Sequence, residues 1–306
     1  MTKILYSHLN RFYKKKQGKL YIQMQKPIPV IVGPTAGGKS KFSIEVAKRL
    51  NGDIINADSL QVYKDIQILS ARPNIAEQEG IPHHLYGYMN AYETCSVSKW
   101  IEDVKQKLET IKNPVFVGGT GMYISALTQG ISPMPEIPNE IREKVRLMPI
   151  EEVKSLVKEC NATDPQRLRR ALEVELSTGK PFLYFQTQPK IKPVDKNFQI
   201  FFLNPPREEL YERCDKRFIQ MLASGAIDEV KHLNKIKATG GVLKAIGVKQ
   251  ISQWLNGDIS NQEMIEDATK ETRHYAKRQI TWFKNQFKEA ITFQPSDIEN
   301  VLKTYF

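Results

Sequence analysis

The stretch GPTAGGKS, residues 33–40, decides the fold class, because it satisfies the rule G-x-x-x-x-G-K-[ST] of a phosphate-binding loop. Its glycines let the backbone curl so that several N–H groups point at one anion, and the following helix adds partial positive charge. Lys39 would place its charge on the phosphate oxygens, and Ser40 would ligate Mg²⁺. The loop predicts a di- or triphosphate site, as in ATP-binding and other nucleotide-binding proteins. It consists of Gly33, Pro34, Thr35, Ala36, Gly37, Gly38, Lys39 and Ser40.

The sequence around this loop alternates in the manner of an α/β protein. A continuous apolar run at 29–32 precedes the loop, as expected for a strand buried on both faces of a parallel sheet, and helical periodicity follows over 39–50. Further strands are predicted at 54–58, 114–117 and 198–203. We therefore predict a parallel sheet flanked by helices, similar to that of P-loop nucleoside triphosphatases.

Composition and pattern divide the chain of 306 residues into four parts. Residues 1–26 contain seven Lys and Arg and no acidic residue, and we predict that this basic leader is disordered. We interpret it as a tail, or as an upstream extension ahead of Met24, rather than as a transit peptide. Residues 27–131 form the first part of the P-loop core, 132–193 a mostly helical insertion, and 194–306 the second, mostly helical part of the core.

The overall composition is that of an ordinary soluble globular protein, with 41% hydrophobic and 26% charged residues. No apolar stretch approaches the roughly 18 residues of a membrane span. The three cysteines are isolated and show no zinc-ligand spacing, so we expect buried thiols in a reducing cytosol. The net charge of the whole chain is +11. Outside the leader only a mild excess of positive charge remains, which suits a polyanionic partner.

The ends of the predicted strands indicate what the loop is used for. A nucleoside triphosphatase also needs an apolar strand that ends in Asp or Glu, which holds magnesium and helps to orient water. The strand at 114–117 ends in glycines, and the strand at 198–203 ends in Asn204. Asp58 alone supplies a carboxylate at the edge of the sheet, where α/β proteins bind ligands. We interpret it as a general base, with a helix N-cap or a magnesium ligand as the alternatives.

Residues beside Asp58 suit contact with a second substrate. Ser59, Leu60 and Gln61 follow it directly. Thr120 lies in the GGTG sequence at 118–121, at a strand end opposite the phosphate loop, and would line a substrate channel. GGTG is by itself only a turn signal.

Seven further blocks accompany the phosphate loop. They are NADSLQVYKDI (56–66), IPHHL (81–85), VFVGGTGMYISAL (115–127), TDPQRLRRALEV (163–174), RFIQMLASGAIDEV (217–230), LKAIGVKQ (243–250) and AKRQITWF (276–283). In these blocks and their order, the chain resembles the tRNA dimethylallyltransferases, also called tRNA isopentenyltransferases, from Pro27 to about Gln286. The resemblance implies transfer of a dimethylallyl group from dimethylallyl diphosphate to N6 of the adenine immediately 3′ of the anticodon in certain tRNAs, with release of pyrophosphate.

The resemblance also implies roles for single residues. The loop amides, Lys39 and a Mg²⁺ near Ser40 would stabilise charge on the departing pyrophosphate. Asp58 would hydrogen-bond the adenine amino group and take its proton, Thr120 would touch the target nucleotide, and Arg217 would lie near the pyrophosphate. The catalytic residues expected from the resemblance are thus Asp58, Lys39, Thr120 and Arg217.

A tRNA substrate must present its adenine flipped out of the anticodon loop, since N6 is unreachable in a stack. The resemblance implies contacts from a basic segment of the insertion and from the 243–250 block, where Gly247 would let the backbone approach the RNA closely. The residues expected to contact the tRNA anticodon stem-loop are Asp58, Ser59, Leu60, Gln61, Thr120, Arg142, Gln166, Arg167, Leu168, Arg169, Arg170, Lys244, Gly247 and Lys249.

The chain departs from the family pattern in three respects. The stretch between Arg142 and Asp164 is shorter than we expect of bacterial members, which leaves open how the insertion docks on the anticodon stem. Gly37 and Ser40 stand where many members have Ser and Thr, and both replacements preserve the chemistry. The chain has no C-terminal zinc finger of the eukaryotic kind, which favours a bacterial or organellar protein.

Two other functions are consistent with parts of the pattern. One is a P-loop kinase of a small metabolite, with Asp58 as the base for a hydroxyl group. The missing second acidic strand end and the basic insertion count against it. The other is a non-catalytic RNA-binding protein that uses the loop as a nucleotide switch, and Asp58 and Thr120 count against that. We expect a cytoplasmic monomer without membrane attachment.

Overall fold

The structure is a computed structural model that describes residues 11–16, 19–24, 26–158, 160 and 162–306. By its internal contacts the chain forms two compact units. The larger unit comprises Met1–Thr128 and Val194–Phe306, and the smaller unit comprises Gln129–Pro193.

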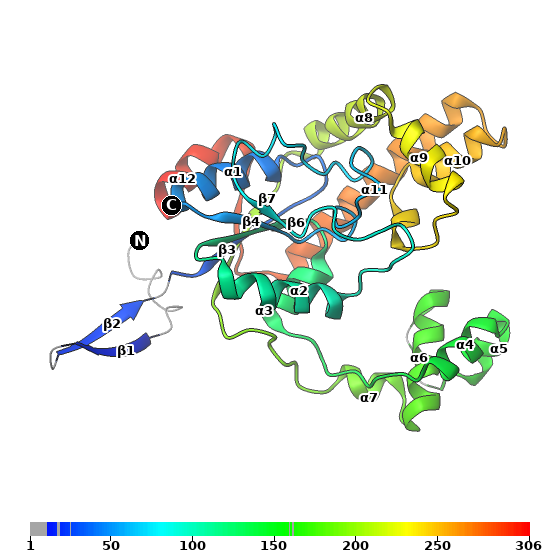
Figure 1. Cartoon of the computed structure of the whole chain (residues 1–306), viewed down its shortest axis with the longest axis horizontal. Coiled ribbons are helices and arrows are strands. Elements are labelled where there is room, and N and C mark those ends of the chain that lie inside the picture. Colours follow the sequence, from blue (N-terminus) through cyan, green and yellow to red (C-terminus); the bar gives the residue numbers. More distant parts are fainter. Residues whose placement is uncertain (1–10, 17–18, 25, 159, 161) are drawn as a thin grey trace. The chain divides into compact units, whose positions relative to one another are not determined.

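The larger unit is built on a parallel sheet. In the part of the chain that the structure describes, this sheet has six strands, and every neighbouring pair is parallel (Figure 1). In spatial order the strands are β5 (His83–His84), β4 (Asp53–Asn56), β6 (Pro114–Gly118), β3 (Ile28–Val32), β7 (Phe198–Leu203) and β8 (Ile291–Phe293). The predicted parallel sheet is confirmed, whereas β5 and β8 were not predicted, because two or three residues carry no readable periodicity.

Helices cover both faces of this sheet. Figure 1 shows α1 and α12 on one side and α2 and α3 on the other. Phe42 on α1 packs against Phe293 with ring centroids 4.9 Å apart, and on the opposite face Trp100 stacks on Tyr123 at 4.7 Å. The helical elements of this unit are α1 (Lys39–Leu50), α2 (Val97–Thr110), α3 (Gly121–Gln129), α8 (Arg207–Ala223), α9 (Ala226–Lys235), η1 (Gly241–Lys244), α10 (Val248–Leu255), α11 (Asn261–Gln286), η2 (Pro295–Asp297) and α12 (Ile298–Tyr305).

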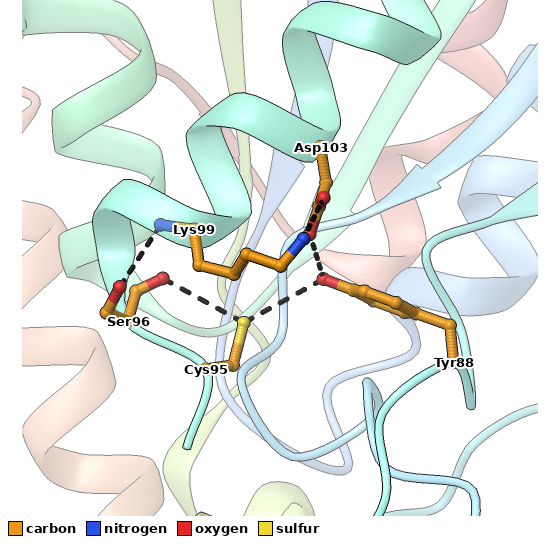
Figure 2. Close-up of polar contacts among 5 residues, drawn as sticks. All are labelled: Tyr88, Cys95, Ser96, Lys99 and Asp103. Atoms are coloured by element: carbon orange, nitrogen blue, oxygen red, sulfur yellow. Dashed lines mark hydrogen bonds and ion pairs between the residues drawn. The ribbon is translucent and has the colours of Figure 1, made fainter. Parts of the chain in front are cut away.

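The first turns of α2 carry a cluster of polar side chains (Figure 2). Ser96 caps the helix by accepting a hydrogen bond from the Lys99 backbone N–H at 3.1 Å. Asp103, one turn further on, pairs with Lys99 Nζ at 2.5 Å and accepts a hydrogen bond from the Tyr88 hydroxyl at 2.7 Å. The Tyr88 hydroxyl also lies 3.8 Å from Cys95 Sγ. These contacts fix the start of α2.

The three cysteines are all free thiols. Cys214 is fully buried, as the sequence predicts, but Cys95 and Cys160 are only partly buried. The expectation of three buried thiols is therefore wrong for two of them.

The smaller unit is helical, as predicted. It contains α4 (Asn139–Leu147), α5 (Ile150–Leu156), α6 (Pro165–Thr178) and α7 (Phe182–Gln186). Asp164 caps α6 by accepting from the Arg167 N–H at 3.0 Å, and Gly179 ends the helix in the left-handed region at φ 70°. The core of this unit is formed by Val145, Val153, Leu168 and Leu172.

The basic leader differs from the predicted disorder. It contains two antiparallel strands, β1 (Arg11–Lys16) and β2 (Lys19–Met24), paired from Arg11↔Met24 to Lys16↔Lys19. The prediction rested on the high charge of the segment and gave too little weight to the strand-forming residues Phe12, Tyr13, Tyr21 and Ile22. Residues 1–10, 17, 18 and 25 lie outside the described part of the chain.

Nowhere among the described residues is there a helix of the length and apolar character needed to cross a membrane.

Candidate active site

A cavity of about 930 Å³ lies in the larger unit, at the carboxyl ends of its central strands. The phosphate loop follows β3, Asp58 follows β4, and Gly118 ends β6, and residues of all three segments line the cavity. Parallel sheets bind ligands at this edge because their loops and helix N-termini converge there.

The phosphate loop forms the floor of the site around the start of α1. Thr35 to Ser40 line the cavity, whereas Gly33 and Pro34 are buried. Gly38 adopts the left-handed φ of 92° immediately before α1, a conformation that favours glycine. Lys39 Nζ donates to the Pro34 carbonyl at 2.7 Å, so the lysine curls over its own loop. Burial lowers the pKa of Lys39 from 10.5 to about 8, and the nearby Asp58 carboxylate partly opposes this.

Arg217 on α8 approaches the loop from the other side of the cavity. Its Nη1 donates to the Thr35 hydroxyl at 3.2 Å. Burial lowers the pKa of Arg217, and the neighbouring Cys214 and Asp58 oppose that shift. The structure thus brings the predicted residues Lys39 and Arg217 to one anion-binding loop.

Asp58 is held in place by the backbone and by Asn56. The fully buried Asn56 side chain accepts from the Asp58 N–H and donates to the Asp58 carbonyl, both at 2.9 Å. Asp58 Oδ1 accepts from the Leu60 N–H at 2.9 Å. This contact makes a turn rather than a helix cap, since no helix of the described chain begins at this point. Asp58 lines the cavity and acts electrostatically on both Lys39 and Arg217.

Thr120 contacts the loop that carries Asp58. Its Oγ1 accepts from the Ser59 N–H at 2.9 Å and donates to Ser59 Oγ at 3.2 Å. Thr120 is not among the residues that line the cavity, whereas Leu60 and Gln61 are. The structure therefore gives Thr120 a positioning contact, and its contact with a nucleotide stays a prediction. Gln61 Nε2 is engaged with the carbonyls of Ser70 and Ala71, at 3.1 and 3.0 Å.

The sequence analysis missed the residue that anchors the cavity wall at 67–74. Glu229, in the first turn of α9, accepts from the backbone N–H groups of Gln67, Ile68 and Leu69 at 2.7, 2.7 and 3.0 Å. An acidic residue in a first helical turn is a readable signal. Its partners lie about 160 residues earlier, and nothing in the sequence links them.

Two tyrosines that the sequence analysis also missed line the cavity. Burial raises the pKa of both Tyr86 and Tyr275, with a smaller contribution from the Asp58 carboxylate. Both phenols therefore stay protonated at neutral pH and can donate hydrogen bonds to a ligand.

The smaller unit has a basic cavity of its own, of about 480 Å³. Glu143 and Glu173 pair with two of its arginines, Arg146 at 2.7 Å and Arg170 at 3.2 Å. Of the predicted tRNA-contacting residues in this unit, four line the cavity and one, Arg167, is exposed outside it. The lining residues are Arg142, Glu143, Arg146, Gln166, Arg169, Arg170 and Glu173.

Two of the residues predicted to contact tRNA have packing roles in the structure. Leu168 is 6% exposed and lies in the core of the smaller unit, because its position on α6 faces α4 and α5 rather than solvent. Gly247 is buried at φ 100°, and a Cβ there would lie 2.8 Å from Leu69 Cδ2. Glycine is needed at this position for the turn into α10, and its close approach to RNA stays a prediction. Lys244 and Lys249 beside it are exposed.

Comparison with known proteins decides the family. The family model described as IPP transferase matches residues 61–286, and one described as Isopentenyl transferase matches residues 26–86. A tRNA dimethylallyltransferase of Rhizobium etli is 43% identical over 281 residues, which cover 85% of this chain and 94% of that protein. The chain belongs to the tRNA dimethylallyltransferase family.

Solved structures of tRNA dimethylallyltransferases support the fold as well. A tRNA delta(2)-isopentenylpyrophosphate transferase from Staphylococcus epidermidis has a TM-score of 0.65 and 31% identity, covering 91% of this chain and 97% of that one. A eukaryotic dimethylallyltransferase acting on tRNA has a TM-score of 0.74 and 29% identity, covering 92% and 76%. The predicted family and the P-loop fold are confirmed, and a metabolite kinase is not favoured.

Proposed function

We propose that this chain transfers a dimethylallyl group from dimethylallyl diphosphate to N6 of the adenine immediately 3′ of the anticodon in certain tRNAs, and releases pyrophosphate. The observation that supports this most is that one cavity contains the phosphate loop with Lys39, Arg217 of α8 bound to that loop, and the Asp58 carboxylate. The loop can hold a diphosphate, and the carboxylate can take a proton from the nucleophile.

The proposed step breaks a C–O bond and leaves every P–O bond intact. N6 of the adenine attacks C1 of the dimethylallyl group as the C1–O bond breaks, and N6 transfers a proton to Asp58. Charge that grows on the departing pyrophosphate is stabilised by the loop amides, Lys39 and Arg217. Because an aromatic amine is a poor nucleophile, alignment of the two substrates carries much of the rate.

The residues present fit a Mg²⁺ ion held mainly by the diphosphate. Ser40 lines the cavity next to Lys39, and its hydroxyl is the ligand we propose from the protein. The described residues contain no group of three or more His, Cys, Asp or Glu that could hold a metal. Mg²⁺ commonly takes its other ligands from phosphate and water, and it would neutralise charge on the leaving group.

We propose that the tRNA contacts both units, with the flipped adenine beside Asp58, Leu60 and Gln61 and the RNA backbone on the arginines of the smaller unit. Arg142, Arg169 and Arg170 suit phosphate contacts, which position RNA without reading its sequence. We propose that the chain acts as a monomer in the cytoplasm.

Incubation with labelled dimethylallyl diphosphate and an anticodon stem-loop, with and without ATP, tests the proposal. We expect prenylated RNA in both conditions. A stem-loop that carries guanine in place of the target adenine is the matched control and should give no product. Absence of transfer, together with ATP-dependent phosphorylation of a small metabolite, would instead support the kinase alternative.

A further inference from the structure

Gln279 connects two segments of the active site that are far apart in the sequence. It lies on α11 and is only 6% exposed. Its Oε1 accepts from the Thr35 backbone N–H at 2.8 Å, and its Nε2 donates to the Gly119 carbonyl at 2.9 Å. Both functional groups of one side chain are therefore used, one on the phosphate loop and one on the GGTG turn.

Each of these two segments carries part of the reaction. The Thr35 hydroxyl accepts from Arg217, and the loop continues to Lys39, so this segment holds the diphosphate. On the other side, Thr120 follows Gly119 and binds Ser59, the residue after Asp58. Contacts thus run without a break from the phosphate loop through Gln279 to the loop of the base.

The surroundings of Gln279 leave little freedom for this connection. A Cβ added to Gly119 would clash with Gln279 Nε2, and one added to Gly121 would clash with the ring of Trp282, one turn further along α11. The GGTG turn therefore sits directly against the helix. A buried N–H or carbonyl without a partner costs about 1–3 kcal/mol, so loss of the carboxamide would favour movement of one loop or the other.

We propose that Gln279 is a positioning residue that sets the spacing between the phosphate loop and the Asp58 loop, and so aligns the bound prenyl diphosphate with the attacking amine. This rests on the proposed function. Gln279 touches neither substrate in this proposal; it acts through Thr35 and Gly119. Loss of alignment should lower kcat far more than it raises KM, because the loop amides, Lys39 and Arg217 keep their contacts with one another when the phosphate loop shifts against the Asp58 loop.

Gln279→Met tests this with a side chain of similar length that makes neither hydrogen bond. We expect kcat to fall by about 10- to 100-fold, since small misplacements of reacting groups have effects of that size. The KM for dimethylallyl diphosphate should change by less than about threefold. Gln262→Met, at the exposed start of the same helix, is the control and should leave both constants unchanged.

Gln279→Glu adds a readout that a purely structural residue would not give. An ionised carboxylate can accept from Thr35 but repels the Gly119 carbonyl, whereas the protonated acid can accept and donate as glutamine does. The kcat of this variant relative to wild type should therefore rise by about tenfold between about pH 8.5 and pH 6, because burial raises the pKa of the introduced carboxyl group. Asp58, Lys39 and Arg217 are near in both proteins, so the wild-type pH profile is measured alongside and the variant is expressed relative to it.

The proposal is overturned by a Gln279→Met protein with wild-type kcat, by a rise in KM alone, or by a pH-independent ratio for Gln279→Glu. If Gln279→Met does not fold, the kcat of Gln279→Glu relative to wild type still tests the proposal, because both proteins are measured at each pH. Failure of the proposed function looks different, because wild type itself would then give no prenylated RNA.

Discussion

Asp58 and Lys39 face the same cavity, but different contacts fix them. Asp58 is fixed by hydrogen bonds from its own turn, through Leu60 and Asn56. Lys39 donates to the Pro34 carbonyl, a contact that an anion in the loop would replace. The base is therefore positioned before substrate binds, while the lysine must move its proton-bearing nitrogen toward the diphosphate.

Asp58→Asn should separate catalysis from binding. The amide oxygen keeps the hydrogen bond from Leu60 but cannot take a proton, so we expect kcat to fall by about 10²- to 10⁴-fold, as for loss of a general base. The Kd for the anticodon stem-loop should stay within about threefold. Asp53→Asn, at the other end of β4 and paired with His84, is the matched control. A variant with near wild-type kcat would remove Asp58 from the mechanism.

The lowered pKa of Lys39 makes binding of dimethylallyl diphosphate pH-dependent. The ammonium form prevails below about pH 8 and the neutral amine above it, so affinity should be highest below that value and fall as pH rises through it. Calorimetric titration between about pH 7 and 10 measures this. Lys39→Arg should bind with no such decline, because a guanidinium stays charged throughout that range. A wild-type Kd that is flat across the range would contradict the assignment.

At the scale of elements, α9 and α11 hold loops around the cavity in place. Glu229 on α9 fixes the loop at 67–69, and Gln279 on α11 fixes two turns at strand ends. Neither was predicted from the sequence. The residues that α9 and α11 hold are distant in the chain, and helical periodicity reports only which face of a helix is apolar.

Glu229→Ala should loosen the wall that α9 supports. Three backbone N–H groups would lose their acceptor, so we expect the free energy of unfolding to fall by about 2–4 kcal/mol and the KM for the prenyl diphosphate to rise. Urea unfolding measures the first and steady-state kinetics the second. Asp228→Asn, the exposed neighbour, should change neither appreciably. Equal effects of the two substitutions would show that the three contacts do not stabilise the wall.

The same limit explains why the packing roles of two single positions were not predicted. Leu168 was grouped with the arginines around it, although a helix turns neighbouring residues to different faces, and its own face is the core of the smaller unit. Gly247 was interpreted through RNA contact, although its positive φ and its packing against Leu69 already require glycine. By contrast, the phosphate loop and Asp58 could be predicted because motif and strand end lie within a few residues of each other.

At the scale of the whole molecule, the two units divide two tasks: the larger contains the cavity for chemistry and the smaller contains the arginine-lined cavity. Sequence composition was enough to find this division, since prolines and charged helices mark the insertion. It could not show which arginines are already paired within the protein, as Arg146 and Arg170 are with Glu143 and Glu173.

Arg142→Gln should weaken tRNA binding through charge. Loss of one phosphate contact should raise the Kd for the anticodon stem-loop by about fivefold to tenfold at low salt and reduce the slope of log Kd against log salt by about one. Lys154→Gln removes the same charge from the same unit, at an exposed position outside the arginine-lined cavity, and should alter neither. Indistinguishable results for the two variants would place the RNA elsewhere.

The claim that the phosphate loop stabilises an intact leaving group is tested most directly by following the bridging oxygen. Dimethylallyl diphosphate that carries a heavy-oxygen label between C1 and the α-phosphorus is incubated with the stem-loop, and the products are weighed by mass spectrometry. We expect all of the label in pyrophosphate, with the adenine gaining an unlabelled five-carbon group. Label that stays with the five-carbon group, or a phosphoryl group transferred to the RNA, would contradict C–O cleavage and the role assigned to the loop.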